Sequence, residues 1–256
     1  QGPWVDDKEV VGYDGGRQAD TISASGNAAG DSFGHRNRGR SGASESDTLV
    51  VRISSIGHCR REVAYQELGY DITNPSREHW ENSARMGDAA EPIIVDRLEE
   101  HGNKVIYALD KQQTVEWAWP KGGLIFRGHP DGNFYGKGVG ANIAKNLEMK
   151  ALNHERTEAI VEQGVQVVTP AYYDQVHGYM RAKDQAETLL VIMDRNDGRI
   201  HEIVVPFDRE HWKGLVNRWL EVVPIILGGE LPERDFGQGS FPCAVCKFRD
   251  ECWGKS

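Results

Sequence analysis

The chain has 256 residues, of which 39% are hydrophobic and 27% are charged, and its formal net charge is −9. This length and composition predict one sizeable folded domain. The acidic balance argues against a broad basic surface that coats nucleic acid, and no apolar run reaches the roughly 18 residues that span a bilayer. We therefore expect a soluble, cytoplasmic protein without membrane contact.

The first part of the chain, residues 1–48, is rich in glycine, serine and charged side chains and has few apolar anchors. Such a composition buries too little apolar surface to offset the entropy cost of ordering. We expect a disordered or extended tail over residues 1–48 and one folded domain over residues 49–256.

Hydrophobic periodicity and turn signals predict a mixed α/β (α+β) domain. We expect strands at residues 49–53, 104–109, 113–119, 124–135, 146–152, 187–194 and 199–206. We expect helices at residues 55–68, 76–101, 154–163, 170–184 and 208–227. Pro92 should kink or divide the second helix because proline lacks the N–H that the helix needs. A coil is expected after the last helix.

The chain has four cysteines, Cys59, Cys243, Cys246 and Cys252. Three of them are close together near the C-terminus, with the spacing C-x2-C-x5-C, and the fourth lies far upstream. Thiolates bind zinc or iron–sulfur clusters in preference to hard cations. Zinc cages are more often built from two close pairs, whereas a three-plus-one division suits a [4Fe–4S] cluster. A zinc centre, two disulfides or free thiols are the alternatives.

A second candidate site contains Asp131, Glu148 and Lys150. A hairpin would bring Asp131 and Glu148 to one end of a sheet, and Glu148 and Lys150 are two apart, so they share one face of a strand. Carboxylates bind Mg²⁺ or Mn²⁺, and the carbonyl of Met149 is a further candidate ligand. The lysine could help to deprotonate water or stabilise charge when a phosphodiester is attacked. The alternative is a solvated Glu/Lys pair.

Two pairs at helical spacing add to this site. Gly87 and Glu91 are four apart, so a close backbone approach at Gly87 to DNA or to the sheet would let Glu91 reach the metal. Gln175 and Tyr179 also share a helix face and could hold a DNA strand or position the lysine. The alternatives are an exposed glutamate and an ordinary amphipathic helix.

In their order along the chain, these motifs resemble the PD-(D/E)xK nuclease superfamily and, within it, the iron–sulfur RecB-like exonucleases. That group includes the CRISPR-associated exonuclease and the AddB nuclease domain. The resemblance runs through residues 59–252 and depends on the motifs Cys59-Arg60-Arg61, Gly87…Glu91, Gly128-His129-Pro130-Asp131, Glu148-Met149-Lys150, Gln175…Tyr179 and Cys243…Cys246…Cys252.

This resemblance implies a restriction-endonuclease-like core, with a mixed central sheet flanked by helices, and a DNA exonuclease activity that depends on Mg²⁺ or Mn²⁺. It also implies a structural [4Fe–4S] cluster held by the four cysteines. The residues that would carry the activity by position are the metal ligands Glu91, Asp131 and Glu148, the catalytic lysine Lys150 and the Q-x-x-x-Y pair Gln175 and Tyr179. Many relatives carry His at the position of Glu91, and Pro at that of Arg60.

The expected substrate is DNA, single-stranded or at frayed ends, and proteins of recombination, repair or CRISPR adaptation are possible partners. A non-catalytic DNA-binding or assembly module with the same fold is one alternative, and a structure-selective endonuclease is another. The polarity of degradation and the oligomeric state are left open, and an oligomer is possible. Basic side chains that could contact phosphates, or form surface ion pairs instead, are Arg60, Arg61, Arg85, Arg127, Arg181 and Lys183.

Overall fold

The computed structural model describes residues 47–75, 78–137 and 144–254. Its strands are β1 (Leu49–Arg52), β2 (Lys104–Ile106), β3 (Val115–Ala118), β4 (Leu124–Gly128), β5 (Gly132–Tyr135), β6 (Lys145–Leu152), β7 (Glu187–Asp194) and β8 (Ile200–Pro206). Its helices are η1 (Ile53–Ser55), α1 (Arg60–Glu67), α2 (Glu78–Glu100), η2 (Leu109–Lys111), α3 (His154–Gln163), α4 (Val165–Val168), α5 (Pro170–Ala182), α6 (Arg209–Leu227), α7 (Phe241–Val245) and α8 (Arg249–Trp253). The predicted tail lies outside the described residues except for its last two.

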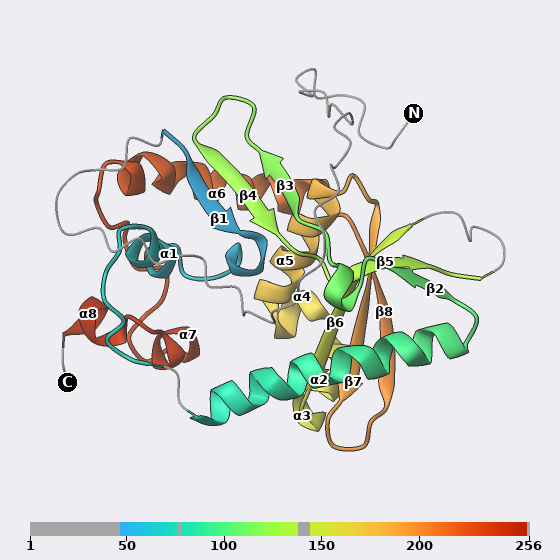
Figure 1. Cartoon of the computed structure of the whole chain (residues 1–256). Coiled ribbons are helices and arrows are strands. Elements are labelled where there is room, and N and C mark those ends of the chain that lie inside the picture. The colour runs from blue at the N-terminus through green and yellow to red at the C-terminus, as the bar shows by residue number, and fades with distance from the viewer. Residues whose placement is uncertain (1–46, 76–77, 138–143, 255–256) are drawn as a thin grey trace, which may run out of the picture.

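Two sheets form the centre of the domain (Figure 1). The smaller has the strand order β1-β4-β3, and the larger has the order β2-β5-β6-β7-β8. Both are mixed, because β1 and β4 pair in parallel, as do β6 and β7, while the other neighbours are antiparallel. Helices flank both sheets, so the predicted mixed α/β class is confirmed.

The central strands of the larger sheet are covered on both faces. Leu147 and Met149 of β6 belong to a buried cluster with Ile94 of α2. Leu152 of the same strand belongs to a different cluster, with Val176 of α5. Because side chains alternate along a strand, odd-numbered residues of β6 face α2 and even-numbered residues face α5.

A third buried cluster lies between the smaller sheet and α6. Trp212 and Trp219 of α6 meet Phe126 of β4 edge to face, with ring centroids 5.7 and 6.2 Å apart, an arrangement that aromatic pairs favour. The side chain of Asp208 caps α6 and accepts two main-chain hydrogen bonds. Among the helices of the described ranges, none is long and apolar enough to cross a membrane.

The C-terminal helices α7 and α8 lie beside α1 (Figure 1). The rings of Tyr65 and Phe248 stack at 5.2 Å between centroids. The main-chain N–H of Asn74 donates to the carbonyl of Lys247 (2.8 Å), and Arg61 Nη1 donates to the carbonyl of Pro232 (2.5 Å). Residues far apart in the sequence therefore meet here, and the coil expected after α6 contains two short helices.

Two predicted helices differ from the structure. The helix expected from residue 55 begins at Arg60, with Cys59 as its N-cap residue, after the short helix η1. Pro92 does not divide α2, which is one helix through this position. Pro92 is exposed, so water can bind the carbonyl that loses its helical partner.

The strand expected at residues 124–135 is two strands, β4 and β5, which belong to different sheets. Pro130 lies at the break and cannot donate to a strand ladder. The chain therefore leaves the smaller sheet after Gly128 and enters the larger one at Gly132. This crossing positions the candidate site.

Candidate active site

The crossing between the two sheets leaves one edge of β6 open. In the described chain, β5 pairs with β6 only as far as Gly132 opposite Leu147. The carboxylate of Asp131 replaces the missing strand partner, and its Oδ2 accepts a hydrogen bond from the main-chain N–H of Met149 (2.7 Å). The N–H and C=O of a strand residue point to the same side, so the Met149 carbonyl faces the side of Asp131.

Glu148 is fully buried, with 0% of its surface exposed. Its Oε1 accepts hydrogen bonds from Lys150 Nζ and from Gln175 Nε2 (2.6 Å). Its Oε2 has no hydrogen-bond partner among the described residues. A buried carboxylate oxygen without a partner is costly, so this position suits a bound cation.

The carboxylates of this site lie close enough to raise one another's pKa. Burial and the neighbouring Asp131 raise the pKa of Glu148 to about 7, and burial, Asp131 and Asp88 raise that of Glu91 to about 7. Burial also raises the pKa of Asp131. Burial opposes the charge of Lys150, but Glu148 and Asp131 outweigh it and raise the lysine pKa. The lysine is therefore held as an ammonium ion, and the carboxylates would gain from a further cation.

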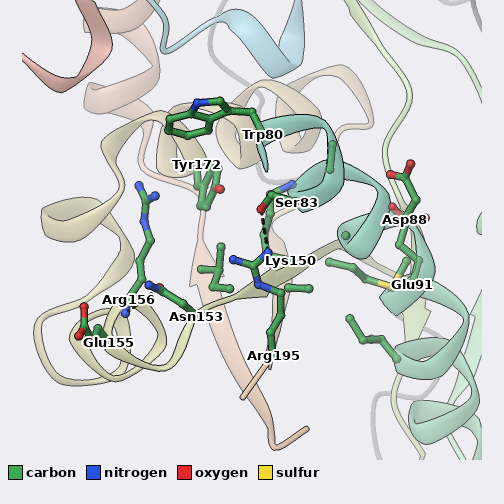
Figure 2. A pocket seen from close by; sticks show the side chains of 16 residues that line it. Trp80, Ser83, Asp88, Glu91, Lys150, Asn153, Glu155, Arg156, Tyr172 and Arg195 are labelled. Atoms are coloured by element: carbon green, nitrogen blue, oxygen red, sulfur yellow. Dashed lines mark hydrogen bonds between the residues drawn. The ribbon is translucent and has the colours of Figure 1, made fainter. Parts of the chain in front are cut away.

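Glu91 reaches the site from α2. It lines a cavity of about 710 Å³ together with Met149 and Lys150 (Figure 2). Gly87, one helical turn earlier, lines the same cavity, and a Cβ at that position would meet nothing within 4 Å. Of the two close approaches considered for Gly87, the one to the sheet is wrong; the glycine borders open space, and an approach to DNA stays a prediction.

Gln175 and Tyr179 are buried and project from the same face of α5. Gln175 holds Glu148, and the Tyr179 hydroxyl donates to the main-chain carbonyl of His129 (2.9 Å). Gly128 makes this contact possible, because a Cβ there would lie 3.0 Å from the Tyr179 ring. Burial raises the pKa of Tyr179, so it stays a neutral donor. This pair fixes the segments that carry the carboxylates.

The donor set fits a hard divalent cation, because it consists of carboxylate oxygens and one main-chain carbonyl. The described residues do not bring oxygens of Glu91, Asp131 and Glu148 within 4.8 Å of one another as a set of three. Mg²⁺ usually binds one or two carboxylates and keeps several waters. Asp131, Glu148 and the Met149 carbonyl can therefore be direct ligands, with Glu91 bound through water or after a side-chain movement.

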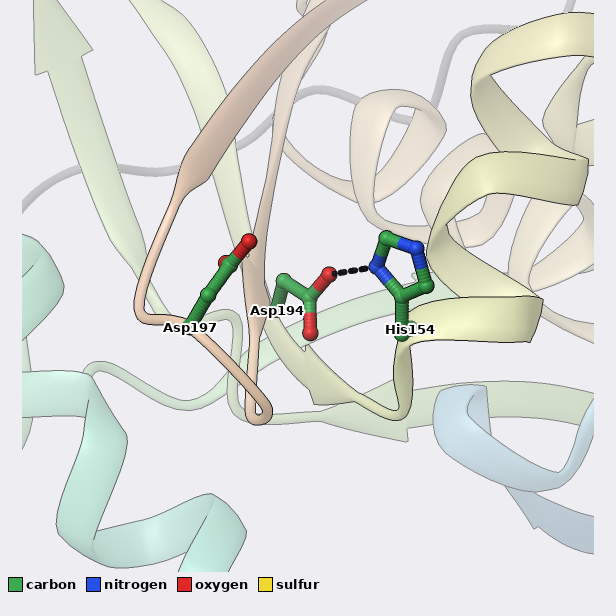
Figure 3. Close-up of side chains that lie close together, drawn as sticks. All are labelled: His154, Asp194 and Asp197. Carbon is green, nitrogen blue, oxygen red and sulfur yellow. Dashed lines mark hydrogen bonds and ion pairs between the residues drawn. The ribbon is translucent and has the colours of Figure 1, made fainter.

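A group of side chains that the sequence pattern does not indicate lies at the turn between β7 and β8 (Figure 3). Ligand atoms of His154, Asp194 and Asp197 lie within 4.8 Å of one another. Asp194 is buried, and its oxygens accept from His154 Nδ1 (2.6 Å) and from the main-chain N–H of Asn196 (2.8 Å). Both oxygens of Asp197 accept from Arg199. With each oxygen already paired, the group stabilises the turn.

Two of the basic side chains named as candidate phosphate contacts form ion pairs, which was the alternative, and a third points inward. Arg60 forms an ion pair with Asp235, and Arg127 forms one with Glu116 (2.7 Å). Lys183 points inward and donates to the carbonyl of Gly132 (2.8 Å), and burial lowers its pKa to about 7. Lys183 therefore supports the segment next to Asp131 and is not placed to contact a phosphate from outside.

The four cysteines come together at the other end of the domain. They are free thiols, and all four line one cavity of about 20 Å³ between α1, α7 and α8. Phe248 N donates to Cys246 Sγ (3.4 Å), and Arg234 Nε donates to Cys252 Sγ (3.3 Å). Burial raises the pKa of Cys59, and it raises that of Cys246 to about 12, so a metal would have to displace protons here.

The sulfur spacing bears on the choice of metal. In a tetrahedral zinc cage with Zn–S bonds of about 2.3 Å, the sulfurs lie about 3.8 Å apart. The described cysteines do not bring three sulfurs within 4.8 Å of one another, which favours a wider group. The cavity itself has room for an object about the size of one water, which favours a single ion. The sulfur spacing is the stronger constraint, because thiolates that share one zinc ion must approach within about 4 Å of one another.

Stability should depend jointly on pH and Mg²⁺. The pKa of about 7 for Glu148 and Glu91 lies above the ordinary value, so their contribution to stability is present below about pH 4.5 and is lost as pH rises through 7. Mg²⁺ should reverse this loss and raise the melting temperature by about 5–10 °C at pH 8, at a concentration 100-fold above Kd. The shift should be much smaller at pH 5.5.

Thermal melts with and without Mg²⁺ at both pH values measure this effect. The variant Glu148→Gln should lose the Mg²⁺-dependent shift at pH 8. Glu155→Gln is the matched control, because Glu155 is exposed in the same cavity. Equal shifts in the wild type and in Glu148→Gln would contradict a metal site at these carboxylates.

Comparison with known proteins gives distant structural matches. No family model and no curated protein matches the chain. An alkaline exonuclease from Laribacter hongkongensis is 17% identical, with a TM-score of 0.48 over 70% of this chain and 89% of its own. A phage-related exonuclease from Haemophilus somnus 129PT is 15% identical, with a TM-score of 0.47 over 71% and 93%. The protein SSO0001 is 15% identical, with a TM-score of 0.49 over 87% and 92%. Structural matches with identities and TM-scores this low do not support a conclusion about function.

Proposed function

We propose that this protein is a DNA nuclease that depends on Mg²⁺ or Mn²⁺ and degrades DNA from its ends. The observation that carries the proposal is the fully buried Glu148, whose Oε2 lacks a partner although Asp131 and Lys150 lie beside it. A solvated Glu/Lys pair, the alternative that the sequence left open, would be exposed. Burying these charges together has a large energetic cost, and such groups are concentrated at functional sites.

The proposed roles follow from the geometry. Asp131, Glu148 and the Met149 carbonyl would hold the cation, and Glu91 would complete its surroundings. A bound Mg²⁺ or Mn²⁺ supplies charge stabilisation for phosphoryl oxygens and a lower pKa for water. Lys150, as an ammonium ion beside Glu148, is suited to stabilise negative charge on the phosphate rather than to act as a base.

Two further residues position these groups. Gln175 keeps Glu148 Oε1 in place through its amide. Tyr179 fixes the His129 carbonyl, two residues before Asp131. Both are buried, so we propose that they orient the carboxylates and do not contact the DNA strand.

We also propose that the four cysteines hold a structural [4Fe–4S] cluster. The support is their convergence on one cavity, the wide sulfur spacing and the donors to two of the sulfurs. Such a centre would join α1 to the C-terminal helices, and it lies apart from the carboxylates in the fold. Its role would therefore be to stabilise the domain.

The nuclease proposal is tested by incubating an anaerobic preparation with end-labelled linear DNA, single-stranded and double-stranded, and with covalently closed circles. We expect nucleotides to be released from linear DNA, with unpaired ends preferred, only when Mg²⁺ or Mn²⁺ is present. Cleavage of closed circles would favour an endonuclease. Binding of DNA ends without release of nucleotides under any metal condition would favour a non-catalytic module and contradict the proposal.

A further inference from the structure

The cavity next to the carboxylates extends beyond the groups that the proposed chemistry uses. Besides Glu91, Met149 and Lys150, its lining comes from the first turns of α2, from the start of α3, from α5 and from the turn after β7. Its volume of about 710 Å³ is in the range of pockets that bind small molecules. This volume is enough for about one or two nucleotides.

The charges of this cavity are divided between its walls (Figure 2). Asp88 and Glu91 of α2 make one wall acidic, Arg156 of α3 lies on the opposite side, and Arg195 lies between them, below Ser83 of α2. Glu155 is the exception on the basic side and is exposed. The cation would bind at the acidic wall and hold one phosphate of a DNA strand there. The arginines are then placed to bind the next phosphate of that strand.

The position of Arg195 is fixed by the structure around it. Its Nη1 donates to Ser83 Oγ of α2 (2.7 Å), and its main-chain N–H donates to the carbonyl of Leu152 (2.8 Å). Arg195 directly follows Asp194, whose carboxylate accepts a hydrogen bond from His154 at the turn between β7 and β8. A guanidinium has five donors, so those not used by Ser83 can bind a phosphate without a large loss of side-chain freedom.

Aromatic side chains border the same cavity. Trp80 is 38% exposed, although tryptophan is usually well buried, and its ring lies 6.1 Å from that of Phe241, which is 60% exposed. Tyr172 also lines the cavity, with Lys150 Nζ 5.2 Å and Arg156 Cζ 5.8 Å from its ring centroid. The cavity thus has an exposed ring at Trp80 and a half-buried ring beside two cations at Tyr172, and aromatic rings combined with cationic groups bind single-stranded nucleic acid.

We propose that this cavity is a single-strand subsite, in which Trp80 stacks on the base of a nucleotide flanking the scissile bond and Arg156 and Arg195 bind its phosphate. The subsite rests on the proposed function, because the phosphate at the carboxylates sets where the flanking nucleotide lies. Bases inside a duplex have both faces covered by their neighbours, so Trp80 can stack only on an unpaired or terminal base. The subsite therefore gives a structural reason for a preference for unpaired DNA.

Binding of a fluorescent oligothymidylate to the full-length chain tests this subsite, with Ca²⁺ in place of Mg²⁺ and the strand checked for integrity. Trp80→Ala should weaken binding about 10-fold, and Trp80→Phe should restore most of the affinity, because phenylalanine keeps a stacking face. Arg156→Ala should weaken binding and reduce its salt dependence by about one ion. Affinity for a covalently closed circular duplex, which has no terminal base, should not change with Trp80→Ala.

Two exposed residues outside the cavity lining provide matched controls. Tyr107→Ala removes an aromatic ring, and Arg97→Ala removes a guanidinium from α2; neither should change binding. Suppose that the wild type releases nucleotides and that Trp80→Ala binds oligothymidylate as tightly, and is as active, as Tyr107→Ala. This result would overturn the proposed subsite and leave the nuclease proposal standing. Trp80-dependent binding without release of nucleotides under any metal condition would keep the subsite and overturn the nuclease.

Discussion

Replacing Glu148 by Gln should lower metal-dependent DNA cleavage on the order of 10²–10³-fold, while the protein stays folded. The side chain is fully buried, and its unpaired Oε2 is the atom best placed to bind a cation. Glutamine keeps the shape of glutamate but not its charge, so a bound cation would lose a ligand. Losses of about 10²–10³-fold are typical when one charge-stabilising group is removed from a catalytic site.

Folding should be much less affected by Glu148→Gln than activity. The variant removes a buried charge that burial and Asp131 disfavour, and this offsets the loss of the partner of Lys150. Lys150→Met should also abolish cleavage, and the double variant should be no worse than the single ones, because groups that act together are not additive. Rates of nucleotide release and thermal melts measure both properties, with Glu155→Gln as control. More than a tenth of wild-type activity in Glu148→Gln would contradict the assigned role.

Much of this site follows from local periodicity. Glu148 and Lys150 share a face because strand side chains alternate, and the Lys150–Glu148 hydrogen bond follows from that spacing. Gln175 and Tyr179 share a helix face for the corresponding reason. Such relations depend only on secondary structure, and secondary structure follows from apolar patterning. The match between the expected and observed strands β6 and β7 has the same cause.

Other features depend on contacts that periodicity does not encode. Residues 124–135, expected as one strand, are apolar only at their two ends, and only the tertiary structure assigns β4 and β5 to different sheets. Arg195 reaches Ser83 across 112 positions of sequence, so the basic wall of the cavity has no local signal. Pro130 was a local signal of the break between strands, but it does not indicate which sheet the chain enters next.

Replacing Cys59 by Ser should prevent assembly of the proposed metal centre and lower the melting temperature by roughly 10–20 °C. Cys59 caps α1, and the other cysteines follow after a loop of about 180 residues. By analogy with crosslinks, closing a loop of this length stabilises a fold by about 5 kcal/mol, and each kcal/mol shifts a chain of this size by roughly 2–4 °C. Iron, sulfide and zinc analysis of anaerobic samples and thermal melts measure the two effects.

Hydrogen bonds also join the same segments, so their contribution to stability must be distinguished from that of the proposed metal centre. Thr73→Val is the matched control, because it removes a side-chain contact to the Lys247 carbonyl (3.5 Å) and leaves the cysteines in place. It should keep the colour and most of the stability. A colourless wild type with one zinc would replace the cluster by a zinc cage, and stability that responds only to thiol reductants would indicate disulfides. An unchanged melting temperature in Cys59→Ser would contradict any joining role, because the C-terminal helices would then be held to α1 by side-chain packing and hydrogen bonds alone.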